Sequence, residues 1–346
     1  MLSNYLKIAW RNILKNKLWS FLNISSLALG IGSCLLIFLF IQDEKSFDTW
    51  HEKSGIIYRL DEIQSFPGTN TQKVALSMPG MGPALIRDYP EIQNYARFWG
   101  RGKRVYTQNE QRLLVEKTVA VDTSFLEMFD FPLLAGNRNT ALDEPFSIVL
   151  TESIAKSFFG NEDPMGKFLR RDTIDYKVTG VLEDVPENSH LQFDILLSMT
   201  SMTRDNPGFN EQFGSNYLVT YVQIDPQADI AGLESKMPEF LLRVMPPEEG
   251  STEAVTDFYQ LFFQELPDVH LASMDIEHDY HNYRKFNGSY LELFTLVALL
   301  ILVIASVNFM NLITARASQR WKEVGVRKTI GAHKMQMFTQ FSIESA

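Results

Sequence analysis

Two stretches of the sequence combine residue types that could do acid–base or metal chemistry. The first, LEDVPENSHLQFD (182–194), gathers four acids and a histidine, which are side chains that act as general acids, general bases or metal ligands. They are Glu183, Asp184, Glu187, His190 and Asp194. Acids around a proline and an Asn-Ser pair are more typical of a solvated turn, and no nucleophile stands beside them. We therefore expect a turn here.

The second stretch, DIEHDYHNY (275–283), places His278 and His281 three residues apart. On a helix the two rings would share a face and could bind a metal. No second ligand pair at a matching spacing accompanies them in the sequence. Two surface histidines near the end of an exported segment are the simpler interpretation, so no metal is expected.

A third stretch, GNEDPMGKF (160–168), resembles a phosphate-binding loop. Such a loop needs four residues between its glycines and a Ser or Thr after the lysine, so that the hydroxyl reaches Mg²⁺. Here five residues separate Gly160 from Gly166, and Phe168 follows Lys167. The spacing favours a Pro-Gly turn at the end of a helix. We expect no cofactor and no enzymatic activity in this chain.

Long apolar segments lie near both ends of the chain. Residues 18–41 carry no charge, and residues 291–313 are uncharged from Leu293 onwards. At a rise of about 1.5 Å per residue, a helix over 18–41 is about 36 Å long, enough for a hydrocarbon core of about 30 Å. A cleaved signal peptide is the alternative at the N-terminus, but no small-residue cleavage site precedes Asp43. Two retained spans are predicted.

The charge distribution indicates which side of the membrane each part occupies. Residues 42–290 contain 22 Lys and Arg against 39 Asp and Glu, a net charge of −17. The flanks are cationic, and cationic flanks stay cytoplasmic. We expect a multi-pass protein of the bacterial inner membrane with cytoplasmic termini and an extracytoplasmic domain over 42–290. Residues 1–17 are predicted to form a cytoplasmic amphipathic helix that contacts membrane lipid.

The exported segment has the signals of an α+β domain. Five stretches with strand composition occur, several with the alternation of a half-buried sheet, at 55–63, 112–121, 175–183, 217–224 and 258–266. Helices are expected at 80–88, 123–129, 151–159 and 229–244. A polar stretch at 202–214 predicts a boundary between two subdomains. The single cysteine, Cys34, lies in the first span, so this domain has no disulfide.

Two sets of residues near the C-terminus carry further hypotheses. Ser306, Asn308 and Asn311 interrupt the second span, and polar groups there usually hydrogen-bond a neighbouring helix. RWKEVGVRKTIGA (320–332) follows the span and combines cations, one acid and two glycines in a sequence of helical character. Its interpretation as a docking helix competes with that of a plain cationic flank.

Several stretches together resemble the MacB/FtsX-type permeases of ABC transporters. They are YLKIAWRNILKNKLWSFLNISSLALGIGSCLLI, SFDTWHEKSGIIYRL, VDTSFLEMFDFPLLAG, SIVLTESIAKSFFGNEDPMGKFL, YKVTGVLEDVPENSHLQFDILLSM and SVNFMNLITARASQRWKEVGVRKTIGAHKMQMFTQFSIESA. The resemblance covers nearly the whole chain in order, and its last stretch is the most specific.

The resemblance implies a MacB-like periplasmic core domain over 42–290 and a cytoplasmic coupling helix at the start of an FtsX-like region over 314–346. Family members have further spans after this region, so the chain is expected to be a piece of a longer permease. The implied partners are a cytoplasmic ABC ATPase, a second permease copy or half, and in some members a periplasmic adaptor. Residues matched to the ATPase-coupling segment are Glu323, Val324, Gly325, Val326, Arg327, Lys328 and Gly331.

The predicted function is therefore that of a non-catalytic permease which couples ATP hydrolysis in a partner to movement of its periplasmic domain, for efflux or mechanotransmission. A membrane-anchored sensor that binds an extracytoplasmic ligand is the alternative. An anchored hydrolase would need a nucleophile, a base and oxyanion donors, and the sequence supplies no such set. The exported segment lacks a basic stripe interleaved with aromatics, so nucleic acid is not an expected partner.

Overall fold

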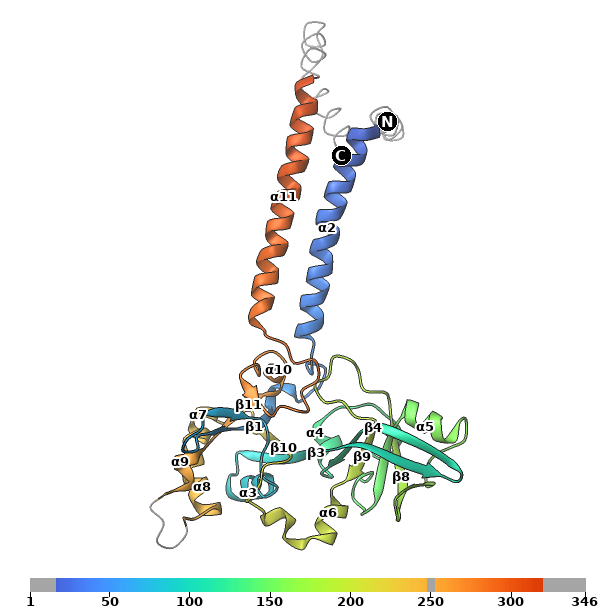
Figure 1. Cartoon of the computed structure of the whole chain (residues 1–346), viewed down its shortest axis with the longest axis vertical. Helices are drawn as coiled ribbons and strands as arrows, with labels where there is room; N and C mark the ends of the chain where they lie inside the picture. Colours follow the sequence, from blue (N-terminus) through green and yellow to red (C-terminus); the bar gives the residue numbers. More distant parts are fainter. Residues whose placement is uncertain (1–16, 248–252, 320–346) are drawn as a thin grey trace. The chain divides into compact units, whose positions relative to one another are not determined.

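The computed structural model describes residues 17–247 and 253–319, which belong to two compact units. The helical unit contains the chain up to Gln42 and from Ser289 onwards, and the domain consists of residues 43–288 (Figure 1). Two apolar helices thus bracket a mixed α/β domain in the sequence, as predicted.

The helical unit consists of α2 (Lys17–Lys45) and α11 (Ser289–Gln319) in its described part. Each contains a stretch long and apolar enough to cross a membrane by length and composition, Ser20–Lys45 in α2 and Ser289–Ala315 in α11. The predicted spans fall within these helices.

Small residues allow the two helices to approach closely. Gly30 is buried against Ala305, and a Cβ atom placed on Gly30 would lie 2.5 Å from the Ala305 Cβ. The Cys34 thiol donates to the Ala298 carbonyl at 3.1 Å. Close contact at small residues is how helices pack in lipid, where apolar burial itself gives little driving force.

A mixed sheet of twelve strands runs through the domain. All five strands predicted from the sequence are present, as β1, β4, β8, β10 and β11. The strands are β1 (Ile57–Gln64), β2 (Gln72–Val74), β3 (Ile92–Gln108), β4 (Gln111–Val121), β5 (Leu133–Gly136), β6 (Ser147–Thr151), β7 (Phe168–Arg171), β8 (Ile174–Leu182), β9 (Ile195–Ser198), β10 (Val219–Ile224), β11 (Tyr259–Glu265) and β12 (Ile276–Glu277).

The strand order along the main path is β12-β2-β1-β10-β3-β4-β9-β6-β8-β5, with β11 paired to β1 and β7 paired to both β3 and β8. The pairs β12–β2, β4–β9 and β6–β8 are parallel, and the others are antiparallel. β3 and β4 form a long ribbon with two bulges, between Gly100 and Gly102 and between Gly102 and Arg104. A bulge bends its strand and changes the direction of the side chains beside it.

Short helices cover the sheet. Those predicted at 80–88, 123–129 and 151–159 are present as α3, α4 and α5. The helices of the domain are η1 (Ser54–Ile56), α3 (Met81–Asp88), α4 (Phe125–Met128), α5 (Glu152–Phe159), α6 (Thr200–Asp205), η2 (Pro207–Glu211), α7 (Ile230–Glu234), α8 (Met237–Val244), α9 (Val255–Phe258) and α10 (Leu266–Val269).

The single helix predicted over 229–244 is wrong. α7 ends at Glu234, and α8 begins at Met237 with Pro238 in its first turn. Proline lacks an N–H and clashes with the preceding turn, so it suits the start of a helix and interrupts the interior of a longer one.

Three clusters of apolar side chains form the core. A central one is rich in phenylalanine, a second lies under α5 with β6, β8 and β9, and a third lies under α3 and α8 with β1 and β11. The strand path runs through all three, and residues 43–288 form one compact unit. The predicted pair of subdomains stays unconfirmed, and α6 and η2 occupy most of the stretch where the boundary was expected.

Candidate functional site

The first and last segments of the domain meet in a buried polar cluster, which we call the juncture (residues 43–53, 59–61, 189–190, 221 and 264–288). Phe47 is 1% exposed, and its ring stacks on that of His270 with centroids 3.5 Å apart. The backbone N–H of Phe286 donates to the His270 carbonyl, and that of Tyr283 donates to the His190 carbonyl. The chain thus ties its two connecting segments to each other and to the turn at 182–194.

Glu44, in the last turn of α2, is a buried acid of the juncture. Its carboxylate lies 2.7 Å from His270 Nε2 and 3.2 Å from Arg284 Nη2, and Arg284 also pairs with Asp43. Burial lowers the pKa of His270, and this effect outweighs the opposing hydrogen bond to Glu44. A neutral ring that donates from Nε2 to a buried carboxylate holds the two segments together without a second buried charge.

Asp48 starts a relay that reaches the centre of the sheet. It accepts from the Ser189 hydroxyl at 3.0 Å, lies 2.7 Å from His190 Nδ1, and the other ring nitrogen of His190 lies 2.6 Å from the Tyr221 hydroxyl. Because a carboxylate only accepts, Nδ1 carries the ring proton and Nε2 accepts from the phenol. Complete burial raises the pKa of Tyr221 well above its usual value, so the phenol remains a donor.

His51 anchors the segment to the loop before β5. Its Nδ1 accepts from the backbone N–H of Asp130 at 2.9 Å, and the Asp130 carboxylate accepts from the Glu52 N–H at 2.7 Å. Burial lowers the pKa of His51 to about 4, despite the nearby carboxylates of Asp48 and Asp130. The hydrogen-bond pattern agrees, because a protonated Nδ1 could not accept.

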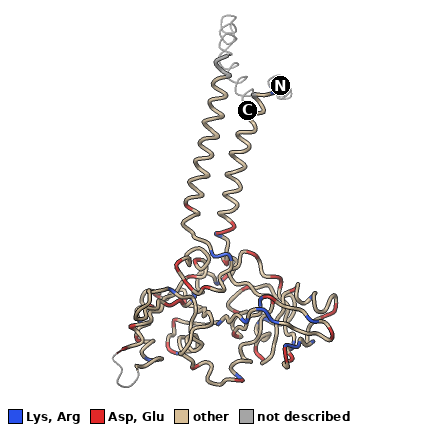
Figure 2. Tube along the Cα trace, in the orientation of Figure 1, with Lys and Arg blue, Asp and Glu red and all other residues tan. Residues whose placement is uncertain are grey.

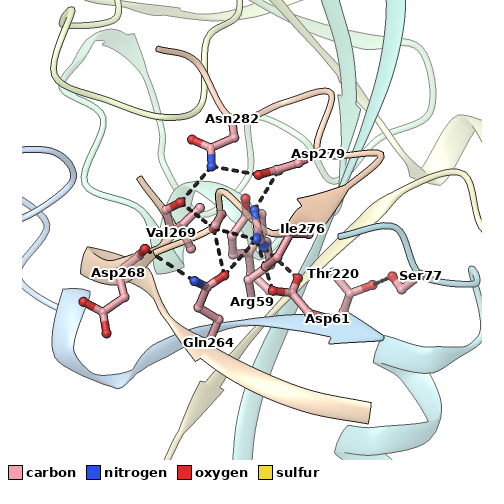
Figure 3. Close-up of polar contacts among 12 residues, drawn as sticks. Arg59, Asp61, Ser77, Thr220, Gln264, Asp268, Val269, Ile276, Asp279 and Asn282 are labelled. Carbon is pink, nitrogen blue, oxygen red and sulfur yellow. Dashed lines mark hydrogen bonds and ion pairs between the residues drawn. The ribbon is translucent and has the colours of Figure 1, made fainter. Parts of the chain in front are cut away.

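Arg59 on β1 is the centre of the juncture (Figure 3). Its side chain is 1% exposed, and its guanidinium binds both oxygens of Asp61 at 2.7 and 3.1 Å and Asp279 at 2.8 Å. The same group donates to Gln264 at 2.8 Å and to Ser273 at 3.1 Å. One arginine therefore joins β1, β11 and the last segment of the domain.

The two acids beside Arg59, Asp61 and Asp279, differ in their surroundings. Burial raises the pKa of Asp61 to about 6, because desolvation exceeds the effect of Arg59 beside it. Asp279 accepts a further hydrogen bond from Asn282 at 2.8 Å, and Asn282 also donates to the Val269 carbonyl (Figure 3). With its charges internally paired, the network is suited to holding segments in place and offers no free nucleophile or base.

A groove of about 640 Å³ opens in the same domain. Its lining contains no Asp, Glu, Lys or Arg, and consists of Gln64, Gln72, Val74, Leu76, Gly100, Gly102, Asn216, Tyr217, His278, Tyr280 and His281. Behind Gln64 and Asn216 lies Glu62, which accepts from both of them and is 0% exposed. Burial raises the pKa of Glu62 to about 7.

Two family models match this chain in order along its length. The MacB-like periplasmic core domain matches residues 20–240, and the FtsX-like permease C-terminal region matches residues 295–346. The chain belongs to the MacB/FtsX-like family of ABC transporter permeases.

Relatives of the family are distant in sequence. A macrolide export ATP-binding/permease protein MacB of Wolinella succinogenes is 22% identical over 98% of this chain and 50% of its own length. The MacB of Bdellovibrio bacteriovorus is 24% identical over 57% of this chain and 28% of its own length. YvrN of Bacillus subtilis, an uncharacterised ABC transporter permease, is 18% identical over 99% and 82%. The chain spans half or less of the length of the two MacB relatives.

Among solved structures, a domain of a permease protein from Porphyromonas gingivalis superposes with a TM-score of 0.53 at 23% identity. The superposition covers 62% of this chain and 90% of that one. This similarity supports the fold of the domain, and the position of the family match agrees with it.

The structure separates the acids and histidine of 182–194. Glu183 and Glu187 are exposed, as expected for a solvated turn. Asp184 instead accepts from the Ser153 N–H at the start of α5, and Asp194 accepts from the Lys117 N–H. His190 is buried in the juncture. The expectation of a wholly solvated turn is therefore wrong at its C-terminal end, where burial provides a partner for Asp48.

His278 and His281 do not lie on a helix, because the segment after β12 is a turn with His278 at φ 52°. His278 is exposed, and its Nδ1 lies 2.6 Å from the Tyr280 hydroxyl. His281 is half-buried and less exposed than predicted: its ring packs on Gly100, where a Cβ atom would clash with it, and burial lowers its pKa. Within residues 17–247 and 253–319, no group of three His, Cys, Asp or Glu side chains could hold a metal ion.

Some of the remaining candidate residues lie in the described part of the chain, and others lie outside it. Residues 160–168 form the predicted turn after α5, with Gly160 and Gly166 at positive φ and Lys167 paired to Glu162. Ser306 donates to the Leu302 carbonyl of its own helix, while Asn308 and Asn311 are exposed on α11. The coupling residues 323–331 and the predicted helix over 1–17, apart from Lys17, lie outside the described residues.

Sequence reasoning missed the juncture almost entirely. Arg59 and Asp61 lie two residues apart on β1, with Leu60 between them, and inward-facing charges in a buried strand were the available signal. Their partners are distant in the chain: Asp279 is 220 residues from Arg59, and Glu44 is 226 residues from His270.

Proposed function

We propose that this chain is the non-catalytic permease part of an ABC transporter, and that it couples ATP hydrolysis by a separate cytoplasmic ATPase to movement of its 43–288 domain. The juncture is the observation that carries the proposal. It joins the segment that continues α2 to the segment that precedes α11 through the buried contact of Glu44 with His270, and it joins β1 to the latter segment through the Arg59–Asp279 ion pair. A displacement transmitted along either helix would therefore act on a single, strongly held part of the domain.

The sequence supplies the rest of the coupling path. We propose that the bacterial inner membrane holds α2 and α11, with cytoplasmic termini, a periplasmic domain and lipid around the exposed apolar side chains of both helices. Glu323, Val324, Gly325, Val326, Arg327, Lys328 and Gly331 would dock as a helix in a groove of the ATPase. A second permease copy would pack against Ser306, Asn308 and Asn311.

The test uses the full-length permease, reconstituted in nanodiscs with its ATPase, and two variants that interrupt different steps. Gly325→Leu adds bulk where close backbone approach is expected and leaves the charge intact, so ATPase association should be lost. Glu44→Leu combined with His270→Leu replaces a buried pair by apolar side chains, a change that buried pairs often tolerate. This variant should still assemble and hydrolyse ATP.

The second readout is movement of the domain. Spin labels at the exposed position 239, in a Cys34→Ser background, report the distance between the two copies of a dimer. ATP should change this distance in the parent protein, and Glu44→Leu/His270→Leu should abolish the change. Arg87→Gln, which removes an exposed ion pair to Asp88, is the control. Normal movement in the double variant, or normal ATPase association of Gly325→Leu, would contradict the proposal.

The groove favours the second candidate, a sensor that binds a ligand in the periplasm. Its volume of about 640 Å³ lies in the range of small-molecule sites, roughly 300–1,000 Å³. A sensor needs no ATPase, so co-purification of an ABC ATPase with the full-length protein separates the two functions.

A further inference from the structure

The bulge of the β3–β4 ribbon holds an arginine without an acidic partner. Gly100 pairs with Val119 and Gly102 with Thr118, so Arg101 is the extra residue of the bulge. Its guanidinium lies 4.0 Å from the centre of the Trp99 ring, and its Nε is buried with no hydrogen-bond partner among the described residues.

Two further arginines approach the same place. Arg171, at the end of β7, has a side chain that is 11% exposed, and its Nη1 is also buried without a partner in the described part of the chain. Its nearest acid, Asp172, is 88% exposed and 4.0 Å from Nε, which is the limit of an ion pair. Burial lowers the pKa of Arg101, and the positive charges of Arg171 and Arg104 add to this effect. Lys and Arg are visible along this ribbon in Figure 2.

Three hydroxyl groups lie buried beside these arginines. Tyr106 and Tyr176 are each 0% exposed, and Thr118 is 1% exposed. Their hydroxyl oxygens are buried and make no hydrogen bond of standard geometry within residues 17–247 and 253–319, although the Tyr106 hydroxyl lies near enough to Thr118 and Arg171 to interact with both. The two tyrosine rings are 6.4 Å apart, and the Arg171 guanidinium lies 5.0 Å from the Tyr176 ring. Five donor groups that approach one another, with no well-formed hydrogen bond to an acceptor of another kind, thus belong to one cluster on β3, β4, β7 and β8.

Such a cluster is unfavourable without a counterpart. Buried polar groups in folded proteins are nearly always hydrogen-bonded, and buried charges are nearly always paired. Elsewhere in this domain the buried arginines follow that rule. From these contacts we infer that Arg101, Arg171, Tyr106, Tyr176 and Thr118 form a binding site for a phosphate-type oxyanion.

The number of donors selects the class of anion. A carboxylate offers two oxygens with about four acceptor positions, fewer than two guanidinium groups and three hydroxyls can fill. A phosphate group offers three or four oxygens, and guanidinium binds phosphate with paired hydrogen bonds. Inorganic phosphate and a lipid headgroup phosphate share this chemistry. The site is distinct from the juncture and the groove, and it does not depend on the proposed coupling function.

Calorimetric titration of the full chain with inorganic phosphate, in micelles of a maltoside detergent, tests the site directly. Chloride at equal ionic strength corrects for screening. Saturable binding is expected, with affinity reduced about tenfold or more in Arg171→Gln and in Tyr106→Phe, since each removes a strong donor. Arg170→Gln is the matched control, because Arg170 is the neighbouring cation and is already paired with Asp175.

The parallel arm uses nanodiscs that contain phosphatidic acid or, for comparison, only a phosphate-free glycolipid. A thermal shift with phosphatidic acid that Tyr106→Phe removes identifies a lipid headgroup as the source, whereas binding of inorganic phosphate identifies a free anion. Tyr106→Phe deletes a single hydroxyl group and should fold normally. It therefore tests the site even if Arg171→Gln does not fold. An absence of binding in both arms, or equal losses in Arg170→Gln and Arg171→Gln, would overturn the inference.

Discussion

The juncture differs from the cluster of Arg101, Arg171, Tyr106, Tyr176 and Thr118, which we call the β3–β4 cluster, in the partners that surround its buried arginine. Arg59 in the juncture is bound by two carboxylates, an amide and a hydroxyl. Arg97, on the same strand as Arg101, is 1% exposed and is bound by both oxygens of Asp122, the Pro79 carbonyl and Asn210. Arg101, four residues later, lies over an aromatic ring, and the positive charges of Arg171 and Arg104 lower its pKa further.

These two kinds of surroundings correspond to two uses of a buried arginine. Where the chain supplies every partner, the arginine fixes distant segments to each other, which suits a part that transmits movement. Where the chain supplies cations and hydroxyls but no anion, the donors are available for a molecule from outside. The comparison therefore predicts different responses to the same kind of substitution in the two regions.

The largest effect is expected for Arg59→Met. This change removes the cation and leaves Asp61 and Asp279 buried without it, which typically costs about 3–5 kcal/mol. The free energy of unfolding of the full chain in detergent measures the loss. Arg101→Met removes a charge that has no acid partner, so its cost without phosphate should lie within about 1 kcal/mol of zero.

Arg87→Gln serves as a control for this pair of variants, because an exposed ion pair contributes at most about 1 kcal/mol. Equal destabilisation by Arg59→Met and Arg101→Met would show that the two regions do not differ. The assignment of the β3–β4 cluster as a ligand site would then lose its main support.

The sequence predicts those strands whose signal lies within their own residues. β1, β4, β8, β10 and β11 carry strand composition within their own residues, and all five were predicted. β3 was missed, although it is the longest strand, because Gly100 and Gly102 interrupt its pattern at the bulges. β6 is buried at every position and so lacks the alternation of a half-buried strand.

The two sites are harder to predict from the sequence than the strands, because their residues come together only in the folded chain. Asp48, His190 and Tyr221 come from three separate parts of the chain, and only their packing gives them a common role. The β3–β4 cluster is less visible still, because its defining property is the lack of a buried acid beside Arg101 and Arg171 in space, where the nearby Asp172 is exposed. The sequence places acids close to both, at Glu110, Glu116 and Asp172.

An intermediate effect is expected at Glu62, where the buried charge has amide partners but no cation. Its folded pKa of about 7 exceeds the usual 4.5, so the folded state binds more protons than the unfolded state between these values. Stability attributable to Glu62 therefore falls as the pH rises through this window. Glu62→Gln should be more stable than the parent by about 3 kcal/mol above pH 7 and nearly equal to it below pH 4.5.

The free energy of unfolding is measured across this pH range for Glu62→Gln and for the parent. In the difference between the two, the contributions of other titratable groups cancel. His51 has the opposite sign: its folded pKa of about 4 lies below 6.5, so its contribution increases as the pH rises from 4 to 6.5. A difference curve that is flat with pH would mean that Glu62 is not desolvated as its burial indicates.

The smallest effect comes from deleting one hydroxyl in each region. Tyr221→Phe removes the donor to His190 Nε2 and leaves that nitrogen buried without a partner, which should cost about 1–3 kcal/mol. Tyr106→Phe removes a hydroxyl that makes no hydrogen bond of standard geometry among the described residues, so its stability without phosphate should change less than that of Tyr221→Phe. Both side chains are at most 1% exposed, so the two variants delete the same hydroxyl group from equally buried positions. Adding phosphate should then stabilise Tyr221→Phe as much as the parent, and Tyr106→Phe much less. If phosphate instead stabilises the two variants equally, the Tyr106 hydroxyl does not contact the anion, and the β3–β4 cluster is a hydrated gap in the packing and not a binding site.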